Sequence, residues 1–160
     1  MASWDELTAQ APELAATVRA RFGAHKHALI ATLRRDGSPR SSGIETDFSR
    51  GELWLGMMPG SRKSADLQRD LRFALHSAPV DLDLVEGDAK LSGRAILVTD
   101  VAFVAEYFGA FEEATGNAPP GGADLYRADL FEAAVVTVEG DRLVIDSWRA
   151  GEAPTRRTRT

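Results

Sequence analysis

The chain of 160 residues carries a formal net charge of −5 and contains no cysteine. Its 44% apolar and 27% charged residues are typical of a globular protein, and this length suffices for one domain with its own core. The absence of cysteine excludes disulfides, thiolate metal sites and thiol catalysis. The acidic balance argues against a nucleic-acid partner or an anionic membrane surface.

The acidic N-terminal residues 1–6 lack the apolar run of a signal peptide. Apolar runs such as 28–31 and 133–136 are far shorter than the roughly 18 residues of a membrane span. We therefore expect a cytoplasmic protein that has no membrane segment.

A helical N-terminal region is predicted over residues 3–22. Ser3 and Glu6 have the spacing of a capping box, and apolar residues follow at near-helical intervals. Pro12 predicts a short helix and then a second helix with the proline in its first turn, which ends at Gly23.

Strands are predicted next, over residues 27–33, 40–48 and 52–57, with turn residues between them. Asp36-Gly37 is a strong hairpin dipeptide in the first of these turns. Ser61 is a good N-cap for a helix that runs to about residue 70.

The second half of the chain is predicted to be mostly strand. The expected order is a strand over 72–77, a strand over 89–98, a helix from 101 to about 114 capped by Asp100, a loop over 115–123, a strand within 125–138 and a last strand over 143–148. About seven strands joined by tight turns predict an antiparallel barrel or sandwich. We expect a single domain over 1–150 and a basic, mobile tail over 151–160.

The turn before the predicted helix at residue 61 has the physics of an anion site. The segment 56–64 lacks the glycine and lysine spacing of a phosphate-binding P-loop. However, Arg62 and Lys63 fall on the first turn of the helix, where the backbone favours negative charge, so two cations there suit a bound anion. The alternative is that both side chains are simply solvated.

Other candidate sites have weaker support. His25, His27 and His76 could ligate a metal, but no acidic cluster adjoins them, so ordinary surface histidines are favoured and no metal is expected. The carboxylate pairs Asp81/Asp83 and Glu112/Glu113 are typical of solvated loop and helix faces.

An ordered set of segments resembles one family. These segments are Arg40-Ser41-Ser42-Gly43-Ile44-Glu45, Gly51-Glu52-Leu53-Trp54-Leu55-Gly56, Ser61-Arg62-Lys63 with Asp66-Leu67, Asp70-Leu71-Arg72-Phe73-Ala74-Leu75, and Leu91-Ser92-Gly93-Arg94-Ala95. Their order and spacing resemble the pyridoxamine 5′-phosphate oxidase-like, FMN-binding split-barrel proteins. The resemblance implies an α+β, mainly β protein: a six-stranded antiparallel split β-barrel with flanking helices. It also implies a homodimer with two cofactor sites at its interface.

The same resemblance assigns cofactor-binding positions residue by residue. Arg62 and Lys63 match the phosphate-binding pair, and Ser61 opens their helix. Arg40 matches the arginine that begins the cofactor-contacting strand. The remaining matches are Ser42, Gly43 and Ile44 beside the ring, and Leu55 and Gly56 at the strand end that faces the ring or the ribityl chain. Met57, which follows them, is expected to be apolar filler, but beside a cofactor ring it is a candidate adaptable packing residue.

The C-terminal part departs from the family pattern. No histidine follows His76, and the substrate-binding end is replaced by Trp148-Arg149-Ala150-Gly151, which argues against oxidation of pyridoxamine phosphate. The resemblance implies a flavin- or deazaflavin-dependent oxidoreductase that transfers hydride to or from a small molecule, with FMN or coenzyme F₄₂₀ as cofactor. For the extra charge of F₄₂₀, Arg34, Arg35 or the C-terminal arginines are candidates. No catalytic side chain is evident.

Three alternatives remain on the same fold. One is a non-catalytic flavin-binding module. Another is a haem-binding or haem-degrading barrel, in which His25, His27 or His76 would ligate the iron. The third is a degenerate family member that binds nothing and serves only in assembly. The loop 116–126 is expected to line the open face of the ring, toward the substrate.

Overall fold

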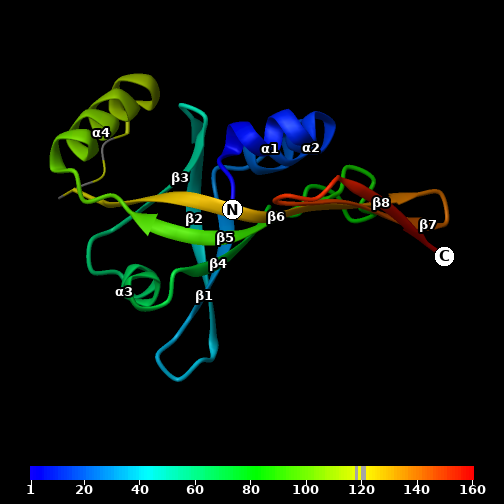
Figure 1. The fold of residues 1–160 in the computed structure, drawn as a ribbon, viewed down its shortest axis with the longest axis horizontal. Coiled ribbons are helices and arrows are strands. Elements are labelled where there is room, and N and C mark those ends of the chain that lie inside the picture. The colour runs from blue at the N-terminus through cyan, green and yellow to red at the C-terminus, as the bar shows by residue number, and fades with distance from the viewer. Residues whose placement is uncertain (118, 120–121) are drawn as a thin grey trace.

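The computed structural model describes residues 1–117, 119 and 122–160. In these residues eight strands form one antiparallel sheet in the order β3-β2-β1-β4-β5-β6-β7-β8 (Figure 1). Because β3 also pairs with β6, the first six strands of this order close into a barrel. The predicted six-stranded antiparallel split barrel is therefore confirmed. Its strands are β1 (Ala28–Leu33), β2 (Pro39–Ser49), β3 (Glu52–Met57), β4 (Arg72–His76), β5 (Asp88–Leu97) and β6 (Asp124–Glu139).

Strand β6 belongs to two parts of the molecule. Its first residues pair with β3, whereas residues 132–139 pair with β7 (Arg142–Arg149). Together β6, β7 and β8 (Thr155–Arg159) extend beyond the barrel as an arm (Figure 1).

A bulge marks the point where β6 passes from barrel to arm. Ser92 pairs with Glu132 and Gly93 with Leu130, so Phe131 is the extra residue. A Cβ on Gly93 would lie 2.4 Å from the carbonyl oxygen of Asp129. Only glycine allows the two backbones to approach this closely.

The N-terminal helices cover one side of the barrel (Figure 1). Helix α1 (Trp4–Gln10) begins with the predicted capping box of Ser3 and Glu6. Helix α2 (Pro12–Gly23) begins at Pro12, as predicted. Their apolar faces, including the fully buried Leu7 and Val18, join the main core.

The predicted mobile tail requires a correction, because Thr155–Arg159 forms β8 and pairs with β7. Arg156 holds the strand in place: its guanidinium lies 2.5 Å from Glu139 and 3.2 Å from Asp146. The sequence shows the arginines, but not that this register would place acidic partners opposite them.

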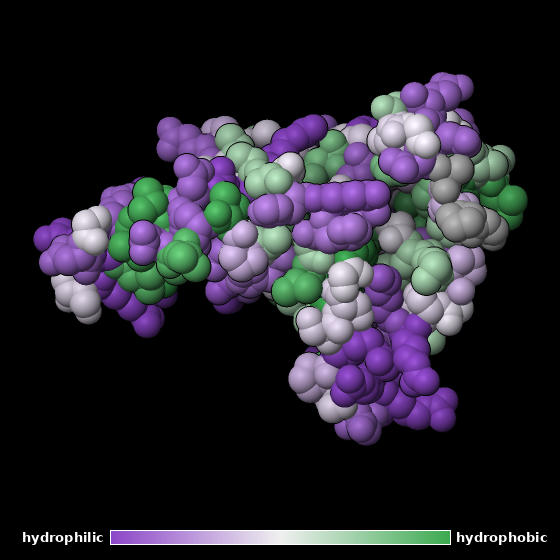
Figure 2. All heavy atoms as spheres, turned by 180° about the vertical axis from the view of Figure 1, so that it is seen from behind, coloured by the Kyte–Doolittle hydropathy of each residue, from purple (hydrophilic) through white to green (hydrophobic). Residues whose placement is uncertain are grey.

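Two further helices flank the barrel, α3 (Arg62–Arg69) after β3 and α4 (Val101–Thr115) between β5 and β6 (Figure 1). Asp100 caps α4 as predicted, accepting from the amides of Ala102 and Phe103. The β1–β2 hairpin projects from the barrel as a hydrophilic finger (Figure 2). Across the described residues, no helix is long and apolar enough to cross a membrane.

Candidate functional site

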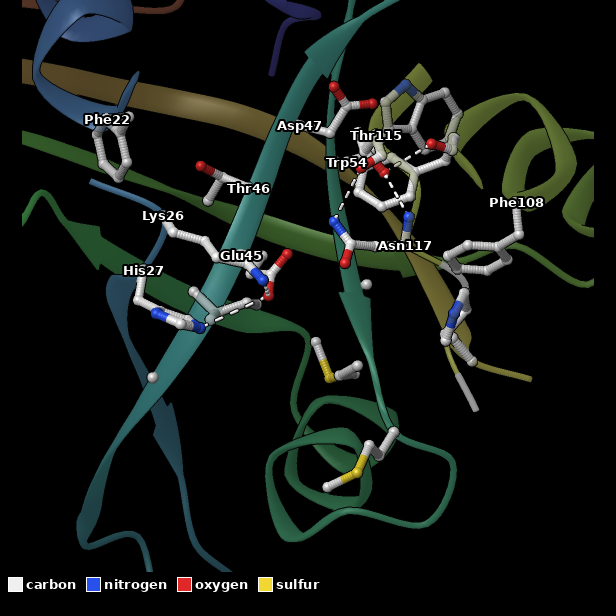
Figure 3. A pocket seen from close by; sticks show the side chains of 18 of the residues that line it. Phe22, Lys26, His27, Glu45, Thr46, Asp47, Trp54, Phe108, Thr115 and Asn117 are labelled. Atoms are coloured by element: carbon white, nitrogen blue, oxygen red, sulfur yellow. Dashed lines mark hydrogen bonds and ion pairs between the residues drawn. The ribbon is translucent and has the colours of Figure 1, made fainter. Parts of the chain in front are cut away.

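A groove of about 830 Å³ lies outside the barrel wall, between β2, β3, α4 and the α2–β1 connection (Figure 3). The side chains of β2 alternate between the two faces of the wall. Ile44 therefore points into the core and is 2% exposed, whereas Gly43, Glu45 and Asp47 belong to the opposite, groove-facing set. Glu45 pairs across the strands with Gly56, and Asp47 with Trp54.

The two strands separate at one end of the groove. Strand β2 pairs with β1 over residues 39–44 and with β3 over residues 45–49. Among the described pairings, the edge of β2 opposite β1 is thus left without a strand partner over residues 39–44. Lys63 reaches this edge, and its Nζ donates to the carbonyl oxygen of Gly43 at 2.6 Å.

Helix α3 begins beside this edge. Ser61 caps it, because its side chain accepts from the amide of Ser64 at 3.3 Å. Arg62 and Lys63 are the first two helical residues, and the first turn holds no acidic residue. Burial lowers the pKa of Lys63 below its ordinary value.

A buried ion pair fixes α3 against the barrel. Nε of Arg40 lies 2.6 Å from Oδ2 of Asp66, whose side chain is 5% exposed. Asp66 also accepts from Arg69 and from the hydroxyl of Thr32. Burial alone would raise the pKa of Asp66, but the hydrogen bonds from Arg40, Arg69 and Thr32 outweigh it and hold the pKa below its usual value.

A second polar cluster fixes the same helix from the other side. The hydroxyl of Ser64 donates to Asp124 at 2.5 Å and lies 2.7 Å from the hydroxyl of Tyr126. Both partners are on β6. Helix α3 is therefore attached to β6 through Ser64 and to β2 through Asp66. The position of Lys63 at the groove follows from this double attachment.

Aromatic side chains of α4 form one wall of the groove. Tyr107, Phe108 and Phe111 lie on one face of the helix and line the groove. Phe108 approaches β3 closely: its ring atoms are 3.7–3.8 Å from the place of a Cβ on Gly56. Trp54 packs on Tyr107 with 5.3 Å between the ring centroids.

The hydroxyl of Tyr107 ties this wall to β2. It donates to Oδ2 of Asp47 at 2.7 Å. Burial, and then the hydrogen bond to Asp47, raise the pKa of Tyr107 far above its ordinary value, so the phenol stays protonated. Asp47 also accepts from Ser49. This carboxylate is therefore committed to structural hydrogen bonds.

The α2–β1 connection places a basic tripeptide at the opposite side of the groove. His25, Lys26 and His27 all line it. Nζ of Lys26 lies 3.4 Å, and Nε2 of His27 3.5 Å, from the same oxygen of Glu45 (Figure 3). The connection therefore brings two potential cations to one carboxylate.

The predicted site residues separate into two groups. Five of them line the groove: Gly43, Ile44, Gly56, Met57 and Lys63, with the side chains of Ile44 and Met57 turned into the core. The others do not line it: Arg40 pairs with Asp66, Leu55 is fully buried in the core, Ser61 caps α3, and Ser42 and Arg62 lie outside the lining.

Other predicted positions fall elsewhere. Arg34 and Arg35 lie on the β1–β2 hairpin, and the C-terminal arginines lie on β8, so none of these lines the groove. His76 lies on β4, with Nδ1 2.6 Å from the carbonyl oxygen of Ser77. Of the loop expected to face the substrate, Asn117, Pro119 and Ala123 line the groove, and residues 118, 120 and 121 lie outside the described part of the chain.

Sequence reasoning missed the aromatic wall and the carboxylates of β2. The strand alternation was a usable signal for Glu45 and Asp47, because they share the parity of Gly43 along β2. For Tyr107, Phe108 and Phe111, helical spacing marks one face, but the sequence does not say what that face packs against. Among the described residues, no three histidine, aspartate or glutamate side chains are grouped to hold a metal.

No family model and no curated protein matches the sequence. Among solved structures, PhzG from Burkholderia lata, in complex with tetrahydrophenazine-1-carboxylic acid, is 17% identical with a TM-score of 0.65, over 97% of this chain and 92% of that one. A pyridoxamine 5′-phosphate oxidase-related, FMN-binding protein from Nostoc punctiforme is 11% identical with a TM-score of 0.63, over 91% and 94%. The chain has the fold of these pyridoxamine 5′-phosphate oxidase-related proteins.

A haem-binding protein also shares this fold. The heme binding protein from Mycobacterium smegmatis is 18% identical with a TM-score of 0.62, over 84% of this chain and 57% of that one. The fold therefore accommodates more than one kind of ligand, and the choice for this chain depends on its own groove.

Proposed function

We propose that the chain is an oxidoreductase that binds FMN or coenzyme F₄₂₀ in the groove, at the interface of a homodimer. Its substrate is a small molecule other than pyridoxamine phosphate. The observation that carries this proposal is the Lys63 ammonium, which stands at the start of α3 beside the unpaired edge of β2.

The start of α3 suits the phosphate that both cofactors carry. Lys63 and Arg62 offer two cations, Ser61 offers a hydroxyl, and the first turn offers free backbone amides at the positive end of the helix dipole. Lys63 now donates to a neutral carbonyl oxygen, that of Gly43. A phosphate oxygen is a stronger acceptor for the same ammonium.

The edge of β2 suits a flat ring. Residues 39–44 pair with β1 along one edge of β2. Along the opposite edge, their backbone groups have no strand partner among the described residues. The space beside Gly43 is open, since a Cβ there would meet nothing within 4 Å. A tricyclic ring can therefore lie against this edge, and the volume of about 830 Å³ is within the roughly 300–1,000 Å³ of ligand sites.

When bound, either cofactor supplies the group that accepts or donates hydride. The chain then contributes binding and orientation. Lys63 and Arg62 hold the phosphate, β2 holds the ring edge, and the α4 wall of Tyr107 and Phe108 excludes water. Asp47 and Tyr107 hold each other, so neither is assigned as a proton donor.

The outer face of the barrel supports the homodimer. Ala31, Ala74 and Ser92 lie directly opposite one another on β1, β4 and β5, on the face away from the core. Leu29 on the same face of β1 is 47% exposed. A row of small residues with an exposed leucine leaves room for a second copy, and the same patch on both copies would form a two-fold interface.

The test is the visible absorption spectrum of the protein purified from its own host, followed by reconstitution with FMN and with F₄₂₀. We expect a flavin or deazaflavin spectrum, and turnover of quinones or enones without turnover of pyridoxamine phosphate. A tightly held flavin without any turnover would favour the non-catalytic flavin-binding module. A protein that retains neither cofactor contradicts the proposal.

Haem binding is the second candidate, because His25 and His27 both line the groove and offer imidazole ligands there. Since His76 does not line the groove, this alternative rests on His25 and His27. A Soret band that is lost in the His27→Ala variant would support it.

A further inference from the structure

The groove has a second basic point in addition to Lys63. It is formed by Lys26 and His27, whose side chains are 59% and 65% exposed and contact a single oxygen of Glu45. A single carboxylate oxygen faces both basic side chains. The ammonium of Lys26 has three N–H donors, so an incoming carboxylate can accept a hydrogen bond there as well.

The opposite side of the groove is apolar. Phe108 and Phe111 are partly exposed, and both line the groove from α4. Figure 3 shows Phe108 in this position. Phe108 is held in place by Tyr107, whose ring meets it edge-on at 5.2 Å. Aromatic rings fixed in this way favour a planar ligand that stacks or packs edge-to-face on them.

We propose that the groove takes a planar substrate that carries a carboxylate, with its ring against Phe108 and Phe111 and its carboxylate at Lys26 and His27. That this ligand is a substrate rests on the function proposed above. The recognition of a planar carboxylate does not rest on that function, because it follows from the two sides of the groove alone.

Glu45 and Lys26 should have opposite effects on the binding of a carboxylate. It shares the basic point with the ligand, so it competes for Lys26 and His27 and repels a second carboxylate. Removing the charge of Glu45 should strengthen the binding of a carboxylate, whereas removing Lys26 should weaken it. A merely structural role for these residues predicts no such opposition.

The experiment is calorimetric titration with 2-naphthoate and with its neutral analogue 2-naphthamide, on the cofactor-free and the FMN-loaded protein. For naphthoate we expect Lys26→Ala to weaken binding about three- to tenfold and Glu45→Gln to strengthen it by a similar factor. Neither variant should change binding of the naphthamide. Phe111→Leu should weaken both probes, and Arg35→Ala, which removes a cation outside the groove, should weaken neither.

Two results would overturn the proposal. One is equal affinity for naphthoate and naphthamide, with neither Lys26→Ala nor Glu45→Gln having an effect. The other is that Lys26→Ala weakens binding of F₄₂₀, with its glutamate tail, but not of naphthoate, because the basic point then serves the cofactor. Failure of the proposed function appears separately, as loss of FMN and F₄₂₀ binding while naphthoate still binds.

Discussion

Arg40 has a buried partner in the structure that the family resemblance does not indicate. The resemblance implies that it contacts the cofactor, whereas the structure pairs it with Asp66 beneath α3 at 2.6 Å. We therefore predict that Arg40→Ala destabilises the fold. Asp66 is 5% exposed and Arg40 17% exposed, and a hydrogen bond to a buried charge contributes about 1.5–3 kcal/mol.

Because Asp66 keeps Arg69 and Thr32 as partners, we expect a loss of about 2 kcal/mol in the free energy of unfolding, within the range for one such bond. With a urea m-value of about 1–3 kcal/mol/M, the unfolding midpoint of the cofactor-free protein should fall by about 1 M. Arg72→Ala is the matched control. It breaks an ion pair of the same 2.6 Å length whose arginine is 64% exposed, and should not shift the midpoint measurably.

The pH dependence provides a second check on the same pair. The pKa of Asp66 is lowered in the folded protein, so its stabilisation is present above the pKa of an unfolded aspartate, about 3.9, and is lost as the pH falls through the folded value. The difference in urea midpoint between wild type and Arg40→Ala should be largest near neutral pH and should decrease below about pH 4. If Arg40→Ala unfolds like Arg72→Ala and loses only cofactor affinity, the positioning role is refuted.

Three further predictions concern the anion site, the bulge and the dimer. Lys63→Ala should weaken FMN binding about tenfold or more in a fluorescence titration, with the urea midpoint unchanged, because it removes one charged contact at the surface; equal affinity would remove Lys63 from the site. Gly93→Ala should lower the thermal midpoint by several degrees, since its Cβ would meet a backbone oxygen at 2.4 Å; a wild-type midpoint would contradict the close approach. Ala74→Arg should yield monomers by light scattering, because it places a long cation in the row of small residues; an intact dimer would place the interface elsewhere.

Helix ends and turns could be predicted from the sequence because the residues that determine them lie next to them in the chain. The capping box of Ser3 and Glu6, the Asp36-Gly37 turn and the Asp100 cap each lie within a few residues of the structure they determine. The predicted strands accordingly agree with the observed ones to within a few residues. The observed pairing of residues 124–127 with β3 depends on contacts about seventy positions apart along the chain. The strand pattern left a barrel and a sandwich open, and the family resemblance indicated the barrel.

The candidate site was accessible only in part. Lys63 was found from its place on the first turn of the predicted helix, and Gly43 through the resemblance. The structure brings them into direct contact. The partnership of Arg40 with Asp66, and that of Ser64 with Asp124, were not accessible, because no local pattern identifies which distant charge or hydroxyl a side chain will meet. The aromatic wall was missed for the same reason, since α4 packs through Tyr107 on Trp54, a residue about fifty positions earlier in the chain.

The most direct test of the central claim is a paired titration of the cofactor-free protein with FMN and with riboflavin, which lacks only the phosphate. We predict that FMN binds with one molecule per chain and that riboflavin binds much more weakly, since Lys63, Arg62 and the start of α3 then have no phosphate to hold. We also predict that Lys63→Ala removes most of this difference. Equal binding of FMN and riboflavin, or no binding of FMN or F₄₂₀, would contradict a cofactor site at the start of α3.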